Sequence, residues 1–215
     1  MNVLITGGSS GLGKSITLAL ASNKDNMVFF TYAHSEKSAK EILSMFPSNT
    51  DAIKCDFNQT EDLNSLTRSI DKMNLDLLIN NAYTGRFIKY YFHKSNIEDY
   101  KTSFYINIFP VLHITRQVIN LFRNKKSGQI ITILTKALYD EPIIGASEYL
   151  ANKAYLQSMC KSWQKENSKY NIYCDTICPP FMKTGLTADI DERMMGEVTT
   201  TEEVAQKVID LIKMK

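Results

Sequence analysis

The 215-residue sequence lacks an apolar run long enough to cross a membrane. It also does not open with the charged segment, apolar core and small-residue cleavage site of a signal peptide. Its net charge is only +2, so neither nucleic acid nor an anionic membrane is an expected partner. The four cysteines form no Cys-x-x-Cys pair, and no histidine cluster accompanies them. We therefore expect reduced structural thiols, no metal site and a cytoplasmic location.

Linkers, internal repeats and low-complexity tracts are missing as well. The composition, 44% hydrophobic and 22% charged, is ordinary for a globular protein. The length suffices for one substantial core but is short for two. These properties predict a single domain over residues 1–215.

What the sequence does contain is a regular alternation of short apolar runs and longer helical patterns. The runs are apolar almost continuously, which is typical of parallel strands covered on both faces. Repeated strand–helix units of this kind predict a doubly wound α/β sheet of about six strands. We expect strands at residues 2–6, 27–32, 51–56, 75–80, 128–134 and 171–178. Helices are expected at residues 12–22, 35–46 and 97–123, together with helices that begin near 60 and 201 and one that contains Tyr149 and ends near 168. The 97–123 helix should be broken or bent near Pro110.

The first strand runs into a glycine-rich turn, TGGSSGLGKS, at residues 6–15. Glycine allows a tight turn, lets the backbone approach a pyrophosphate and lets the next helix pack closely on the strand. The N-terminus of that helix offers free N–H groups and the positive end of its dipole to phosphates. Because Gly7, Gly11 and Gly13 lie between a predicted strand and a predicted helix, the turn predicts dinucleotide binding rather than a purely structural role.

Tyr149 and Lys153 are four residues apart on a predicted helix and therefore share one face. A tyrosine has an ordinary pKa of about 10, and a nearby ammonium group favours the phenolate and lowers that value. Such a pair can give or take a proton at a carbonyl or alcohol oxygen. The alternative is a surface Tyr/Lys pair, which the glycine turn and the upstream strand ending at Thr135 argue against.

With these features the chain resembles the short-chain dehydrogenase/reductase family, in its short single-domain branch. The resemblance covers nearly the whole chain and rests on the glycine turn, Asp56 in CDF, NNAY at 80–83, Asn107 in YINIFP, YLANK at 149–153 and PPFMKT at 179–184. It implies a Rossmann fold and an NAD(P)-dependent oxidoreductase that interconverts a carbonyl and an alcohol on a small molecule by hydride transfer. The seventh strand usual in the family has no counterpart. A homodimer or homotetramer is also implied, with the 97–123 and Tyr149 helices available for the contact.

The resemblance assigns roles to individual residues. Asp56 would hydrogen-bond the adenine amino group, with helix capping as the alternative, and Thr184 would bond the nicotinamide carboxamide. Asn107 would hold a water that relays protons to Lys153, with a buried asparagine at the helix kink as the alternative. Together with Tyr149 and Lys153, the expected cofactor-binding residues are Gly7, Ser9, Ser10, Gly11, Leu12, Gly13, His34, Ser35, Asp56, Phe57, Asn81, Ala82, Pro179, Met182 and Thr184.

The end of the second strand favours NADP(H) over NAD(H). An acid at this place would bind the adenosine ribose diol and repel a 2′-phosphate. Ala33 stands there instead, followed by His34 and Ser35, while Glu36 is one step too late and is expected to face outward. The glycine turn has serines where NADP-users often carry a basic residue, so NAD(H) stays open.

The third catalytic position is a departure from the family, where a serine bonds the substrate oxygen. Lys136 stands at the usual spacing from Tyr149, and a charged lysine cannot accept a hydrogen bond. We assign the role to Thr135, one residue earlier, because the loop before Tyr149 can absorb an extra residue at low cost.

Two further departures, Tyr83 and Pro180, stand where the family usually has glycine. Tyr83 is expected to narrow or gate the cofactor cleft. These changes motivate an alternative: a catalytically weak or inactive dinucleotide-binding sensor or subunit. An epimerase or dehydratase that uses transient oxidation is a weaker option. The basic and aromatic stretch 83–96 is expected either to cap the cleft over an anionic or aromatic substrate or to be an ordinary solvated loop.

Overall fold

The computed structural model describes residues 1–87, 90–141, 143–188, 190 and 196–212. Six strands in this part of the chain form one parallel sheet in the order β3-β2-β1-β4-β5-β6. The chain moves outward from β1 to β3 and returns to β4, so the topological switch point lies between β1 and β4. This is the doubly wound α/β sheet that the sequence predicted. The strands are β1 Asn2–Ile5, β2 Met27–Tyr32, β3 Thr50–Lys54, β4 Leu77–Asn80, β5 Gly128–Ile133 and β6 Ile172–Ile177.

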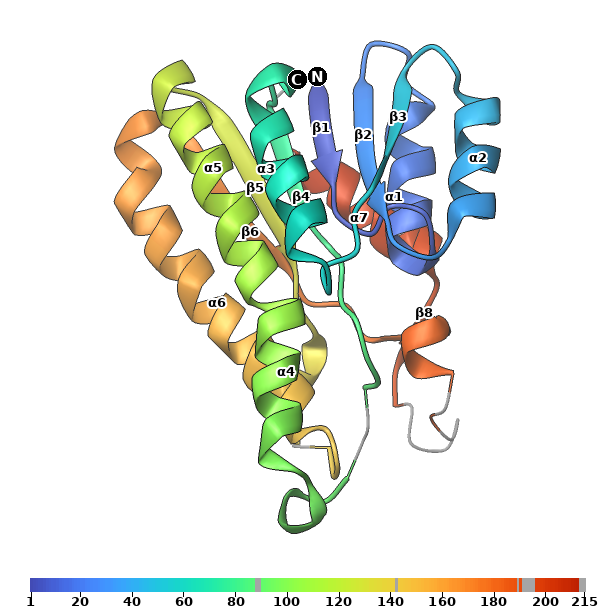
Figure 1. Cartoon of the computed structure of the whole chain (residues 1–215), viewed down its shortest axis with the longest axis vertical. Helices are drawn as coiled ribbons and strands as arrows, with labels where there is room; N and C mark the ends of the chain where they lie inside the picture. The colour runs from blue at the N-terminus through green and yellow to red at the C-terminus, as the bar shows by residue number, and fades with distance from the viewer. Residues whose placement is uncertain (88–89, 142, 189, 191–195, 213–215) are drawn as a thin grey trace.

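Helices cover both faces of the sheet (Figure 1). Buried residues of α3, α5 and α6 share one apolar cluster, and those of α1, α2 and α7 share a second cluster on the opposite face. The bounds are α1 Gly11–Ala21, α2 Glu36–Met45, α3 Thr60–Met73, α4 Ile97–Asn107, α5 Phe109–Lys125, α6 Ser147–Asn167 and α7 Thr201–Leu211, with 3₁₀ turns η1 Phe92–Lys94, η2 Lys136–Leu138, η3 Ser168–Tyr170 and η4 Gly185–Thr187.

The continuous apolar runs arise because both faces of the central strands are buried. In β1, Val3 and Ile5 belong to the cluster beneath α1 and α7, while Leu4 between them belongs to the cluster beneath α3 and α5. All three are fully buried. Successive side chains of a strand point to opposite faces, so neither face can carry a polar residue here.

The segment 97–123 forms two helices. α4 ends at Asn107 and α5 begins at Phe109, with Ile108 between them. Pro110 lies in the first turn of α5, where its missing N–H removes no helical hydrogen bond. The break lets α4 extend beyond the edge of the sheet where the strands end (Figure 1).

The two short strands β7 Phe181–Met182 and β8 Val198–Thr199 pair with each other and not with the main sheet. Within the described residues, the main sheet therefore has six strands and no seventh. In the same residues no helix has the length and apolarity needed to span a membrane, and no cluster of His, Cys, Asp and Glu is arranged to hold a metal ion. All four cysteines are free thiols.

Candidate active site

The glycine-rich turn is fixed to the end of β4. Thr6 Oγ1 accepts hydrogen bonds from the backbone N–H groups of Asn81 (3.0 Å) and Ala82 (3.1 Å). Asn81 Nδ2 donates to the carbonyl oxygens of Thr6 (3.0 Å) and Gly7 (3.2 Å). Gly7 has a φ of +66°, and a Cβ atom on Gly13 would overlap the Gly7 carbonyl oxygen. The turn therefore requires glycine at both places, for the backbone angle at one and for close packing of the helix at the other.

An open cleft of about 450 Å³ lies between this turn and the carboxyl ends of the strands. α1 begins beside it, and its N-cap residue Ser10 makes no side-chain capping hydrogen bond. The N–H groups of the first turn are therefore available to an anion. Most of the expected cofactor residues line the cleft: Gly7, Ser9, Ser10, Gly11, Leu12, Gly13, His34, Ser35, Phe57, Asn81, Ala82, Tyr149, Lys153, Met182 and Thr184.

No acidic side chain is among the described residues that line this cleft. Ala33, His34 and Ser35 line it at the end of β2, and the His34 side chain is 84% exposed. Glu36 instead forms an ion pair with Lys40 one turn along α2, 2.7 Å away. The lining at the end of β2 therefore carries no acid of its own, but Asp56 Oδ2 lies 3.8 Å from His34 Nε2 beside it.

Asp56 does not line the cleft, although its neighbours Cys55 and Phe57 do. Its Oδ1 accepts hydrogen bonds from the backbone N–H (2.9 Å) and the side-chain amide (2.8 Å) of Asn58. These bonds, the backbone one first, hold the pKa of Asp56 below its ordinary value. In this arrangement Asp56 stabilises the turn before α3 without capping the helix, whose N-cap is Gln59, and its role at an adenine stays a prediction.

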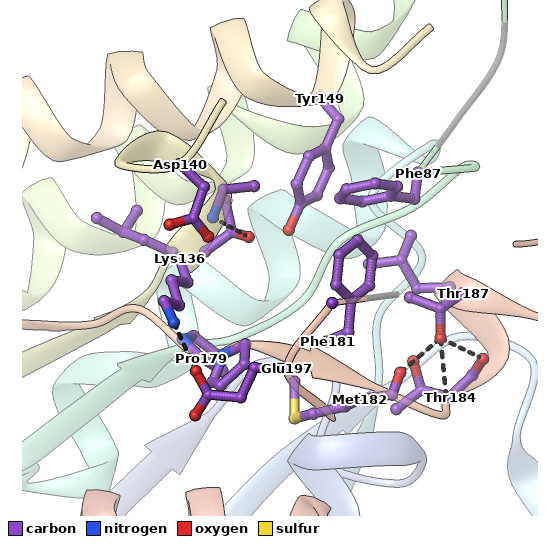
Figure 2. A pocket seen from close by; sticks show the side chains of 16 residues that line it. Phe87, Lys136, Asp140, Tyr149, Pro179, Phe181, Met182, Thr184, Thr187 and Glu197 are labelled. Carbon is purple, nitrogen blue, oxygen red and sulfur yellow. Dashed lines mark hydrogen bonds and ion pairs between the residues drawn. The ribbon is translucent and has the colours of Figure 1, made fainter. Parts of the chain in front are cut away.

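A second, smaller cavity of about 110 Å³ adjoins the cleft and shares Tyr149, Leu134, Met182 and Thr184 with it. Figure 2 shows the Tyr149 hydroxyl directed into this cavity, with Phe87 and Phe181 beside it. Pro179, expected at the cofactor, lines this cavity and not the cleft.

Thr135 and Tyr149 meet at the cavity. Thr135 is 8% exposed at the N-cap of η2, and its hydroxyl accepts from the backbone N–H of Ala137 at 3.3 Å. Burial raises the pKa of Tyr149, and a hydrogen bond with the Thr135 side chain opposes that rise. Burial of Tyr149 thus favours the protonated phenol over the phenolate. Lys136, at the family's usual serine position, turns to the cavity rim and pairs with Glu197 at 2.5 Å.

Lys153 lies below Tyr149 and is almost fully buried. Its Nζ donates to the carbonyl oxygen of Ile133 at 2.8 Å and lies 5.7 Å from the centre of the Tyr149 ring. Burial lowers the pKa of Lys153 to about 8. The sequence predicted that the Lys153 ammonium would lower the Tyr149 pKa. Burial of the phenol raises that pKa instead, and the ammonium donates its hydrogen bond to the Ile133 carbonyl.

The sequence of residues 1–195 matches the family described as short chain dehydrogenase. The chain belongs to the short-chain dehydrogenase family.

Its relatives include reductases of several kinds. The chain is 25% identical to the 3-oxoacyl-[acyl-carrier-protein] reductase FabG of Thermotoga maritima over 97% of this chain and 88% of that protein. It is 28% identical to carbonyl reductase family member 4 of Xenopus laevis over 97% of this chain and 89% of that protein. A short-chain dehydrogenase from Sphingobium yanoikuyae in complex with NADPH has the same fold, with a TM-score of 0.85 at 22% identity over 97% of this chain and 82% of that one.

Asn107, the fourth residue expected in a short-chain dehydrogenase, lines neither cavity. Its Oδ1 accepts from the backbone N–H of Thr84 at 2.7 Å, and its Nδ2 donates to the Thr84 carbonyl (2.9 Å) and to Ser103 Oγ (3.3 Å). The side chain thus joins the end of α4 to the segment after β4. These bonds fit the alternative of a buried asparagine at the helix break, and the proton-relay role stays a prediction.

Tyr83, where short-chain dehydrogenases usually have glycine, turns inward against Tyr149 and Lys153. Its ring meets the Tyr149 ring edge-on at 5.0 Å, and Lys153 Nζ lies 5.2 Å from its centre. Its hydroxyl accepts from Asn152 Nδ2 at 3.4 Å, and Asn152 also donates to Ser103 Oγ at 2.8 Å. Tyr83 therefore lines the cleft, where the sequence analysis expected it to narrow or gate the space, and packs on both residues.

Several residues that line the site were not predicted from the sequence. Phe87 and Phe181 lie beside Tyr149 but are 62 and 32 positions from it in the sequence. Glu197 pairs with Lys136 across 61 positions. No local sequence pattern reveals contacts over such separations. Of the basic residues in the 83–96 stretch, none of the described ones lines either cavity; Lys89 lies outside the described residues.

Proposed function

We propose that this chain is an NADPH-dependent reductase of a small carbonyl compound, with Thr135, Tyr149 and Lys153 as its catalytic residues. The observation that carries the proposal is that Tyr149 lines both the large cleft and the small cavity and meets Thr135 in the small cavity. A dinucleotide in the cleft and a carbonyl in the cavity would both adjoin the Tyr149 hydroxyl. The names of the relatives, which are those of reductases and dehydrogenases, support the same chemistry.

The cleft fits a nicotinamide dinucleotide. The uncapped first turn of α1 suits the pyrophosphate, and the open region at His34 and Ser35 suits a 2′-phosphate. Thr184, on the shared wall, suits the nicotinamide carboxamide, and Lys153 suits the nicotinamide ribose. When bound, the cofactor supplies the hydride that reduces the carbonyl carbon.

The side chains around the small cavity then bind the substrate oxygen and transfer a proton to it. Thr135 donates a hydrogen bond to the substrate oxygen, and the Tyr149 phenol donates the proton that this oxygen gains on reduction. Burial keeps the phenol protonated until that step, as the general acid of a reduction has to be. The Lys153 ammonium stabilises the phenolate that remains.

The alternative, an inactive dinucleotide-binding sensor, is less favoured. Its motivation was that Tyr83, Pro180 and Thr135 depart from the family pattern. Yet Tyr83 packs on the catalytic pair rather than filling the small cavity, and Thr135 supplies the hydroxyl in place of serine. A sensor would bind NADPH without turning over any carbonyl compound.

The test is a fluorescence titration with NADPH and NADH, followed by a screen of aldehydes and ketones with absorbance of the reduced nicotinamide as the signal. We expect tighter binding of NADPH and its oxidation by at least one small ketone. NADPH binding with no turnover across the screen would favour the sensor.

Ala33→Asp should reverse the cofactor preference, because a carboxylate at the end of β2 bonds a ribose diol and repels a 2′-phosphate. We expect the wild type to bind NADPH at least about tenfold more tightly than NADH, a difference of about 1.4 kcal/mol. Ala33→Asn, which adds the same bulk without charge, is the matched control and should keep the order. A tenfold NADH preference in the wild type would contradict this interpretation of β2.

Thr135→Val should lower kcat by about 10²-fold, comparable to the loss of one oxyanion donor, because it keeps the shape and removes the hydroxyl. Thr135→Ser should retain activity, since serine supplies the same donor and acceptors. Thr132→Val, three residues earlier in β5, removes a buried hydroxyl that lines neither cavity and controls for packing. Full activity in Thr135→Val would remove Thr135 from the mechanism.

We also propose a homodimer formed through α4, α5 and α6. Tyr105, Phe109 and Tyr155 on these helices are 57%, 40% and 38% exposed, and a partner subunit would cover them. Sedimentation velocity would distinguish a dimer from a monomer or tetramer.

A further inference from the structure

The small cavity beside Tyr149 limits what the enzyme can accept. Its volume of about 110 Å³ is below the roughly 150 Å³ of a protein cavity that holds one benzene molecule. Most of its wall is apolar and comes from Phe87, Leu134, Phe181, Met182 and Leu186, with Thr135, Thr184 and Thr187 also in the lining. Within the described lining, a substrate that places its carbonyl on Tyr149 has room for a short apolar group in this space.

The charged groups at the cavity carry more negative than positive charge. Lys136, Asp140 and Glu197 line it, and within the described lining these three are the only charged side chains. Figure 2 shows the Lys136 ammonium joined to the Glu197 carboxylate, on the side of the cavity away from Phe87. Asp140 acts on the same ammonium, since both carboxylates raise the pKa of Lys136, Glu197 more strongly.

The lysine is therefore already neutralised. A carboxylate that bound at Lys136 would have to displace Glu197 and would still face Asp140. An uncharged substrate meets no such cost, because the carboxylates have their partner and the walls are apolar.

We propose that the cavity selects a small, uncharged carbonyl compound and discriminates against oxo acids through Glu197 and Asp140. This specificity rests on the proposed reductase activity. The Lys136 and Glu197 side chains are 43% and 64% exposed, so salt should screen part of the discrimination.

Methyl acetoacetate and acetoacetate test the proposal, since they share one ketone and differ by one methyl group and one charge. Reduction of either consumes one NADPH and one proton and yields the 3-hydroxy compound and NADP⁺. At low ionic strength we expect kcat/KM for the ester to exceed that for the acid by at least tenfold. Equal values, or a preference for the acid, would overturn the proposal.

Glu197→Gln identifies the source of the discrimination. The variant removes one negative charge and releases Lys136, so the ester-to-acid ratio should fall at least fivefold, and Asp140→Asn should lower it less. Asp51→Asn removes an exposed carboxylate on β3, away from both cavities, and should leave the ratio unchanged. A ratio that stays the same in Glu197→Gln and Asp140→Asn would show that these carboxylates do not set specificity.

Binding can be measured without turnover. Saturation-transfer NMR on the protein with NADP⁺ reports whether the ester and the acid contact the cavity. A signal from the ester alone, lost in Phe181→Trp, which fills the cavity, would support the specificity even if no carbonyl compound were reduced, and only the proposed activity would then fail. A signal from the acid equal to that of the ester would overturn the specificity.

Discussion

Tyr149→Phe should lower kcat for carbonyl reduction by about 10³-fold, an increase of about 4 kcal/mol in the activation barrier, while leaving NADPH affinity within about threefold. The substitution removes the only atom that would donate the proton and leaves the aromatic ring. That ring packs on Phe87 with centres 4.5 Å apart and on Tyr83 at 5.0 Å, so the fold around it should persist. Stopped-flow absorbance of the reduced nicotinamide with saturating ketone measures the effect.

Tyr155→Phe is the matched control. It removes the same atom from the same helix, but Tyr155 is 38% exposed and packs on Phe104 away from both cavities. Its kcat should equal that of the wild type. If Tyr149→Phe kept more than a tenth of the wild-type activity, the proton would have another source and the proposed mechanism would be wrong.

The parts of the site that the sequence predicted are those set by local geometry. Gly7 and Gly13 belong to one turn, and the requirements for backbone angle and close packing act within a few residues. Tyr149 and Lys153 share a face because a helix has 3.6 residues per turn. The apolar runs predicted buried parallel strands, and the sheet has six of them.

The parts that the sequence did not predict depend on contacts between distant segments. Lys136 stands at the spacing from Tyr149 that a serine usually has. The sequence did not show that Lys136 would pair with Glu197, 61 residues later, or that Thr135 would then lie beside the Tyr149 hydroxyl. Tyr83 was expected to narrow the cleft, but its bond to Asn152 could not be read from either segment. The pKa of Tyr149 was expected to fall beside a lysine, whereas burial among aromatic rings raises it.

Three glycine-to-alanine substitutions test how strictly the glycine-rich turn is constrained. Of these, Gly13→Ala should lower NADPH affinity and Tm the most. Its Cβ would overlap the carbonyl oxygen of Gly7 and crowd Asn81 Nδ2, and the backbone atoms there cannot move without shifting the turn from β1.

We expect Gly13→Ala to lose more than about 100-fold in NADPH affinity, or about 2.7 kcal/mol, and several degrees in Tm, as overpacking typically costs 1–3 kcal/mol. Gly11→Ala meets only Thr184 at 3.5 Å but must adopt a φ of +49°, which costs about 1–2 kcal/mol. Gly196→Ala meets nothing within 4 Å and should match the wild type in Tm and NADPH affinity. Differential scanning fluorimetry and NADPH titration measure both quantities. Wild-type affinity in a folded Gly13→Ala variant would mean that close approach of α1 to the turn is not what forms the cofactor site, and the assignment of the cleft to NADPH would then lose its physical basis.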